Sequence, residues 1–181
     1  MTGGVLGVFG VPVRRRALLA AALVLVTAGA SSADWPRLQI AILAWAQDVE
    51  RLGIPYVWGG GHGPDPGPST GTCAGYTGRI RPCPATSMRG LDCSGLTRWV
   101  YALAHGADVL GPGTTDDHVR RMRPVSRPRP GDLVFFGKGA KTHHVGIYLG
   151  GDRMLNAPET GTYVRVDRVS VRSDIKGFYR Y

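Results

Sequence analysis

Residues 92–103, which read DCSGLTRWVYAL, are the most informative stretch of the chain. A short polar coil runs directly into a helix-like segment, so we predict that Cys93 stands where coil becomes helix. At such a point the free backbone N–H groups and the helix dipole favour a thiolate over a thiol. We therefore interpret Cys93 as a reactive nucleophile, with Asp92 as the cap of its helix. The alternative is a small, inert thiol that only fills the core.

A histidine opens a strand-like segment further along the chain, where residues 144–149 read HVGIYL. Alternation in a strand would turn Val145 and Ile147 toward the core and His144 and Gly146 to the opposite face, with open space at the glycine. A cysteine and a histidine that are distant in sequence but able to meet in space suggest a thiol hydrolase. His143 competes for the role of base, but the strand position favours His144.

An asparagine follows on the next predicted strand, residues 153–157, after the hairpin turn GGD at 150–152. If that turn is tight and symmetric, Asn156 lies opposite Gly146 and on the face of His144; a slip of one residue would undo this. Asn156 would then accept the Nδ1–H of the imidazole and turn Nε2 toward the sulfur. The alternative is that Asn156 is only a turn residue.

The chain contains three cysteines, Cys73, Cys83 and Cys93. In an exported protein an even pair normally bonds and an odd cysteine stays free. Cys73 and Cys83 lie in a Gly/Pro/Thr-rich stretch, which predicts a short disulfide loop and leaves Cys93 reduced. A zinc site built from all three is the alternative, although no Cys-x-x-Cys spacing supports it. We expect neither a metal nor a cofactor.

The first thirty residues resemble an export signal. Three arginines at 14–16 precede an apolar run at 17–26, and small residues at 28–30 offer a cleavage site, with a second candidate after residue 33. We therefore predict a signal peptide at 1–30 and a secreted, extracellular or cell-wall-associated domain at 34–181. The alternative is an uncleaved segment, which would be the chain's only link to a membrane.

Removal of residues 1–30 would lower the formal net charge from +9 to +6. Outside the cell such a surplus favours anionic cell-wall polymers as partners, or serves solubility alone. No nucleic-acid-binding motif is present. Nothing in the sequence indicates oligomerisation, so we expect a monomer.

The order of elements predicts an α+β fold. Residues 35–52 form an amphipathic helix, capped by Asp34, whose core face would carry Leu38, Ile42, Trp45, Val49 and Leu52. The helix of Cys93 ends near Gly106, and a short helix follows within 114–122. Strand-like segments at 132–136, 144–149, 153–157, 163–169 and 177–181 then predict an antiparallel sheet of about five strands. Residues 62–90 form a long insertion, of a length that is usually functional in a small domain.

Four motifs in this order resemble the NlpC family of papain-like peptidases of the bacterial cell wall: YVWGG at 56–60, DCSGL at 92–96, PGDLVFF at 130–136 and HVGIYLG at 144–150. The resemblance covers roughly residues 35–181. It implies a papain-like fold, with N-terminal helices packed on the antiparallel sheet. It also implies hydrolysis of the γ-D-glutamyl–diamino acid bond in peptidoglycan stem peptides.

The resemblance assigns roles to individual residues. Cys93 takes the position of the nucleophile, His144 that of the base and Asn156 that of the third, orienting residue of a Cys-His-Asn triad. Tyr56 matches a tyrosine that helps to hold the oxyanion or substrate, although it is also typical of an ordinary strand aromatic. Asp92 and Ser94 match positions that line the substrate cleft. The chain departs from the family in having Asn156 where histidine is most frequent, and in the insertion at 62–90, which would lie beside the cleft.

Other functions fit the same residues. The Cys93–His144 pair would also serve an N-acetylmuramoyl-L-alanine amidase or an acyl transferase. A catalytically inactive wall-binding domain would retain the fold after its triad had changed at Asn156.

Overall fold

The computed structural model describes residues 35–181, and its first element is helix α1 (Trp35–Arg51). Ile42 and Val49 are buried, as predicted, but Trp45 and Leu52 are 39% and 64% exposed. The prediction for these two residues was wrong because the buried face continues from Ile42 through Ala46, which lies closer to Ile42 around the helix than Trp45 does. The signal segment and the Asp34 cap predicted from the sequence lie outside the described residues.

Helix α2 (Cys93–His105) covers the 92–103 stretch except for its cap, Asp92. Gly106 caps its C-terminal end, with a left-handed φ of 67° that glycine readily adopts. Helix α3 (Thr115–Arg120) follows, with a capping box between Thr114 and Asp117. Between Trp35 and Tyr181 no helix is both long and apolar enough to cross a bilayer.

The main sheet is antiparallel throughout and has the order β3-β8-β4-β5-β6-β7. The strands are β3 (Arg123–Val125), β4 (Leu133–Phe136), β5 (His144–Gly150), β6 (Arg153–Asn156), β7 (Arg165–Arg168) and β8 (Ile175–Arg180), with a 3₁₀ turn η1 (Val169–Val171) after β7. The α+β prediction is confirmed, with six strands in place of about five. The additional strand β3 lies at the edge of the sheet, where Pro124 is tolerated although it cannot donate to the ladder.

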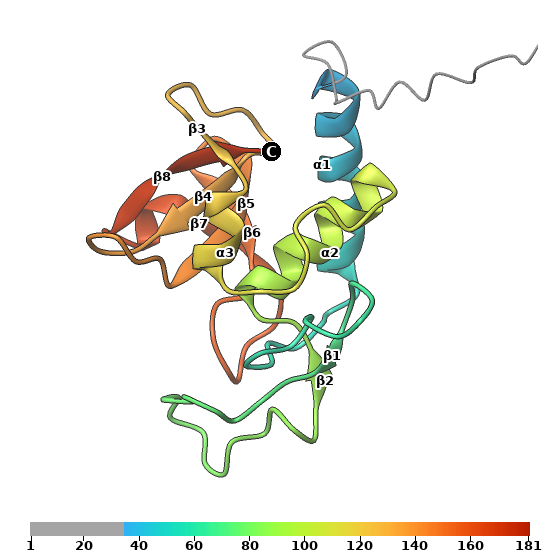
Figure 1. The fold of residues 1–181 in the computed structure, drawn as a ribbon, viewed down its shortest axis with the longest axis vertical. Coiled ribbons are helices and arrows are strands. Elements are labelled where there is room, and N and C mark those ends of the chain that lie inside the picture. Colours follow the sequence, from blue (N-terminus) through green and yellow to red (C-terminus); the bar gives the residue numbers. More distant parts are fainter. Residues whose placement is uncertain (1–34) are drawn as a thin grey trace, which may run out of the picture.

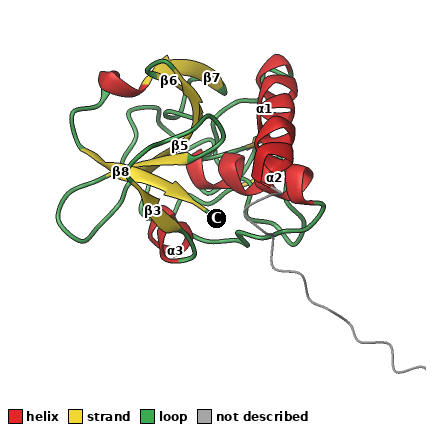
Figure 2. Ribbon diagram, turned by 90° about the horizontal axis from the view of Figure 1, so that it is seen from above, coloured by secondary structure: helices red, strands yellow, loops and turns green. Residues whose placement is uncertain are grey.

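Helices α1 and α2 lie on one side of this sheet (Figures 1 and 2). The core forms where Leu96 and Val100 of α2 join Val145 and Ile147 of β5, all with no exposed surface. Helix α2 is therefore fixed against the strand that begins with His144. The open space predicted at Gly146 is absent, because a Cβ there would lie 2.9 Å from Met154 Sδ.

The insertion at 62–90 runs out from the body of the domain and returns to it (Figure 1). Strands β1 (Ser69–Thr70) and β2 (Arg89–Gly90) pair antiparallel and close its base. Between them a disulfide joins Cys73 to Cys83, with 6.0 Å between their Cα atoms, while Cys93 is free. This pairing agrees with the cysteine prediction and excludes a zinc site built from all three thiols.

Candidate active site

Cys93 stands at the first position of helix α2, and Asp92 caps that helix by accepting a 2.7 Å hydrogen bond from the Gly95 N–H. A Cβ at Gly95 would lie 2.2 Å from the carbonyl oxygen of Gly60. The glycines at 60 and 95 therefore allow the loop after Trp58 to touch the backbone of the first helical turn. This contact explains why the YVWGG and DCSGL motifs accompany each other.

His144 and Asn156 meet across strands β5 and β6. His144 Nε2 lies 3.0 Å from Asn156 Oδ1, and both residues are buried. The Asn156 amide group donates to the carbonyl oxygen of Arg165 at 3.2 Å and to Asp167 Oδ2 at 3.1 Å. Because both of these partners are acceptors, the amide oxygen must face His144, and His144 Nε2 must carry the proton. The expectation that Nδ1 binds Asn156 was therefore wrong, and Nδ1 is the nitrogen that remains free to take a proton.

Cys93 and His144 line the same cavity of about 300 Å³. Beside the sulfur lies the backbone N–H of Val145, the residue that follows His144, and this N–H favours the thiolate. Burial disfavours the thiolate more strongly than this N–H favours it. Burial and the charge of Asp92 together raise the pKa of Cys93 to about 12. The resting thiolate expected from the sequence is therefore disfavoured, because Cys93 is only 8% exposed and burial opposes the thiolate more than the neighbouring backbone N–H groups support it.

Burial and the charge of Arg172 lower the pKa of His144 to about 3. At neutral pH the site thus holds a neutral thiol beside a neutral imidazole with a free Nδ1. A neutral imidazole is the form in which histidine acts as a general base. The neighbouring His143 instead places Nε2 2.6 Å from Asp174 Oδ2.

Tyr56 lies beside Cys93 and lines the cavity that Cys93 shares with His144. Its backbone pairs with Leu91, and its N–H donates to the Thr162 carbonyl at 2.8 Å. Burial, with the nearby Cys93, raises the pKa of Tyr56 well above its usual value. The phenol therefore keeps its proton and presents a hydrogen-bond donor.

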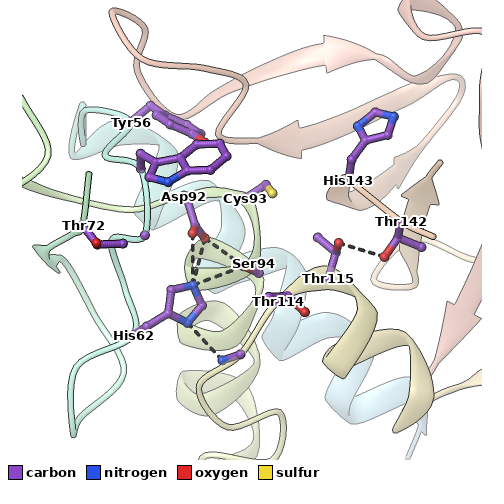
Figure 3. Close-up of a pocket in the computed structure, with 13 residues that line it drawn as sticks. Tyr56, His62, Thr72, Asp92, Cys93, Ser94, Thr114, Thr115, Thr142 and His143 are labelled. Atoms are coloured by element: carbon purple, nitrogen blue, oxygen red, sulfur yellow. Dashed lines mark hydrogen bonds and ion pairs between the residues drawn. The ribbon is translucent and has the colours of Figure 1, made fainter. Parts of the chain in front are cut away.

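Asp92 and Ser94 join a network with His62, which the sequence interpretation missed. His62 Nε2 lies 3.0 Å from Asp92 Oδ1 and 3.1 Å from Ser94 Oγ (Figure 3). The Gly113 N–H donates to His62 Nδ1 at 3.2 Å. That bond requires an unprotonated Nδ1, so a neutral His62 donates from Nε2 to the carboxylate. The histidine at the start of the insertion thus holds the two cleft residues that flank Cys93.

A larger cavity of about 560 Å³ opens on the side of Cys93 where Asp92 and Ser94 lie, while the smaller one lies toward His144. Trp58 lines both, and its indole N–H donates to the Ala74 carbonyl at 3.0 Å within the disulfide loop. The insertion adds Thr72 to the wall of the larger cavity (Figure 3) and residues 76–79 to that of the smaller. It therefore borders the site, as expected.

The profile of the NlpC/P60 family matches residues 53–177. The chain belongs to this family. It is 37% identical over 128 residues to the peptidoglycan endopeptidase RipA of Mycolicibacterium smegmatis, an alignment that covers 67% of this chain and 22% of RipA. It is 32% identical over 121 residues to the gamma-D-glutamyl-L-lysine dipeptidyl-peptidase of Bacillus subtilis, covering 64% and 31% of the two chains.

Among solved structures, this NlpC/P60 domain is similar to RipD of Mycobacterium tuberculosis, which is described as non-catalytic and adapted to peptidoglycan binding. The TM-score is 0.59 at 27% identity, and the match covers 80% of this chain and 96% of that one. The chain spans about a fifth of the length of the first curated relatives that it matches.

Proposed function

We propose that this domain is a cysteine endopeptidase that hydrolyses peptidoglycan stem peptides at the γ-D-glutamyl–diamino acid bond. One observation carries the proposal: Cys93 at a helix N-terminus shares a cavity with a neutral, oriented His144. Family membership supports the substrate class, because relatives are named peptidoglycan endopeptidases and one is named for a γ-D-glutamyl bond.

In the first half of the reaction, the Cys93 sulfur bonds to the scissile carbonyl carbon as its proton passes to His144 Nδ1. Negative charge then moves to the carbonyl oxygen, where the Cys93 N–H and the Tyr56 hydroxyl would donate hydrogen bonds. Transfer of the proton during attack suits a thiol whose pKa is raised, because the charge does not have to rest on the buried sulfur. Asn156 holds the ring throughout by accepting from Nε2–H.

In the second half, the carbon–nitrogen bond breaks and the imidazolium returns its proton to the leaving amine. Water then attacks the thioester with His144 as the base. This step releases the glutamyl carboxylate and restores the thiol. Asp92 and Ser94 would line the part of the cleft that holds the acyl portion of the substrate.

We further propose that the domain acts outside the cytoplasmic membrane, after export directed by residues 1–30. Peptidoglycan lies there, and the disulfide between Cys73 and Cys83 suits an oxidising compartment. Mass spectrometry of the protein recovered from culture medium or cell wall tests this directly. A mature N-terminus near residue 31 or 34 is expected, and an intact Met1 would contradict cleavage.

Digestion of purified muropeptides, followed by mass spectrometry, tests the proposed activity. We expect fragments that end in D-glutamate, and no products with Cys93→Ala. Free stem peptides with an N-terminal alanine would identify an amidase instead, and products joined to an added amine would identify acyl transfer. Muropeptides that bind the protein but remain uncleaved would identify a catalytically inactive wall-binding domain.

A further inference from the structure

Two arginines, Arg79 and Arg172, line the smaller cavity. Arg172 follows the turn η1, is half-buried and lies over the Phe136 ring at 5.9 Å. Arg79 reaches the same cavity from the disulfide-bonded insertion. Within residues 35–181, neither guanidinium has a carboxylate within ion-pair distance. The charge of Arg172 helps to lower the pKa of the nearby Asp174, but that carboxylate makes its hydrogen bond with His143.

The charge of Arg172 acts directly on the reacting groups. After burial, it is the largest cause of the lowered pKa of His144, and it weakly offsets the rise that burial causes in the pKa of Cys93 and of Tyr56. Arg172 also lines the cavity that these three residues share, so its side chain lies where substrate must sit. Its guanidinium is therefore placed to meet an anionic group of the substrate, since planar donors match carboxylates well.

His144 identifies which part of the substrate occupies this cavity. It lines the smaller cavity and not the larger one, whereas Asp92 and Ser94 line only the larger. The leaving amine has to receive its proton from His144, so the amine portion of the substrate lies on the side of the two arginines. In the proposed reaction that portion is the diamino acid.

Diamino acids of peptidoglycan differ in the charge that they place here. meso-Diaminopimelate ends its side chain in an ammonium and a carboxylate, whereas lysine ends in an ammonium alone. Glu159 lines the same cavity and suits the ammonium that both carry. We propose that Arg172 and Arg79 form an anion subsite that selects meso-diaminopimelate over lysine on the leaving-group side of Cys93. This inference rests on the proposed function.

Binding to the Cys93→Ala protein tests the subsite without turnover. Three tripeptides, L-Ala-γ-D-Glu followed by meso-diaminopimelate, its side-chain amide or L-lysine, would be titrated by calorimetry. We expect the first to bind about tenfold to a hundredfold more tightly than the other two, because hydrogen bonds between charged groups are strong. The amide matches the acid in shape, so this comparison isolates the charge.

Arg172→Gln in the same background should abolish most of this preference, Arg79→Gln should reduce it, and Arg172→Lys should retain part of it. The matched control is Arg168→Gln, which removes an exposed arginine that lines neither cavity. Unchanged affinity of the variants for the lysine peptide shows that they are folded. Equal affinities for the three peptides, or a preference that survives both glutamine variants, would overturn the subsite.

Hydrolysis by the unmodified chain separates this result from the proposed function. If the chain cleaves none of the three peptides, the endopeptidase proposal is wrong. The binding ratio still decides whether the arginines select a carboxylate.

Discussion

His144 Nε2 lies 3.0 Å from Asn156 Oδ1, and this single hydrogen bond determines which ring nitrogen carries the proton. The Asn156 amide nitrogen is occupied by Asp167 and by the Arg165 carbonyl, which prevents the amide from rotating. Asp167 is in turn 3.0 Å from Arg165 Nε. A chain of contacts from β7 thus leaves His144 Nδ1 free to act as the base.

Replacement of Asn156 tests this series of contacts. Asn156→Leu keeps the approximate size but cannot accept from His144, so kcat should lose part of the roughly 10²–10⁴-fold that a positioned general base contributes. KM should change little, whereas the melting temperature should fall, because the buried His144 Nε2–H, the Arg165 carbonyl and Asp167 each lose a partner. Asn156→His should restore activity, because imidazole accepts at one nitrogen and donates to Asp167 from the other. If Asn156→Leu retained full kcat, or the histidine variant failed while folded, Asn156 would not be an orienting residue.

The raised pKa of Cys93 predicts slow reaction with iodoacetamide in the free protein. Burial holds the sulfur as a thiol, with its pKa near 12, so the alkylation rate should rise about tenfold per pH unit between pH 6 and 9 as the thiolate fraction grows. Mass spectrometry would follow the reaction, with Cys93→Ser as the unreactive control. A fast rate that did not depend on pH in this range would show a resting thiolate–imidazolium pair instead.

The sequence led to several parts of the site correctly for physical reasons. Asp92 before an apolar helical run predicts the start of helix α2, since its carboxylate satisfies a free N–H there. Asn156 could be placed near His144 because side chains alternate along both strands and the pairing Tyr148 opposite Met154 has the required register. Helix capping and strand alternation were enough to place these residues, because both depend only on neighbours along the same helix or hairpin.

Other parts depend on contacts that no local pattern contains. The ring nitrogen that meets Asn156 follows from how the imidazole enters the site, which alternation along a strand does not specify. His62 meets Asp92 from a Gly/Pro-rich loop that has no period, although its place directly after the glycines of the YVWGG motif is a signal. The thiol pKa was misjudged because the helix N-terminus was considered without the depth of burial.

The lowered pKa of His144 predicts a loss of stability in acid. Burial and Arg172 lower this pKa from 6.5 to about 3, so between these values the unfolded chain takes up a proton that the folded chain does not. The free energy of unfolding should therefore fall as the pH falls through this window, by up to about 1.4 kcal/mol per pH unit from this group.

His144→Gln should remove that part of the dependence. Urea unfolding of both proteins at pH 6.5, 5.5 and 4.5 gives the difference in slope. Burial also lowers the pKa of His118, but this residue is present in both proteins and cancels in the comparison. Identical slopes would mean that His144 takes up its proton in the folded chain at an ordinary pH.

Arg98 fixes the loop that carries His62. Its guanidinium is buried and donates to the carbonyls of Gly61 and Gly63, each at 2.9 Å, and to Asp108 at 2.7 Å. Arg98→Met keeps the apolar stem but leaves these acceptors unpaired, so the free energy of unfolding should fall by about 3–5 kcal/mol. The control is Arg120→Met, which breaks only an exposed ion pair with Asp117 and should cost at most about 1 kcal/mol. Urea unfolding at neutral pH compares the two, and equal losses would show that the buried contacts do not hold the loop.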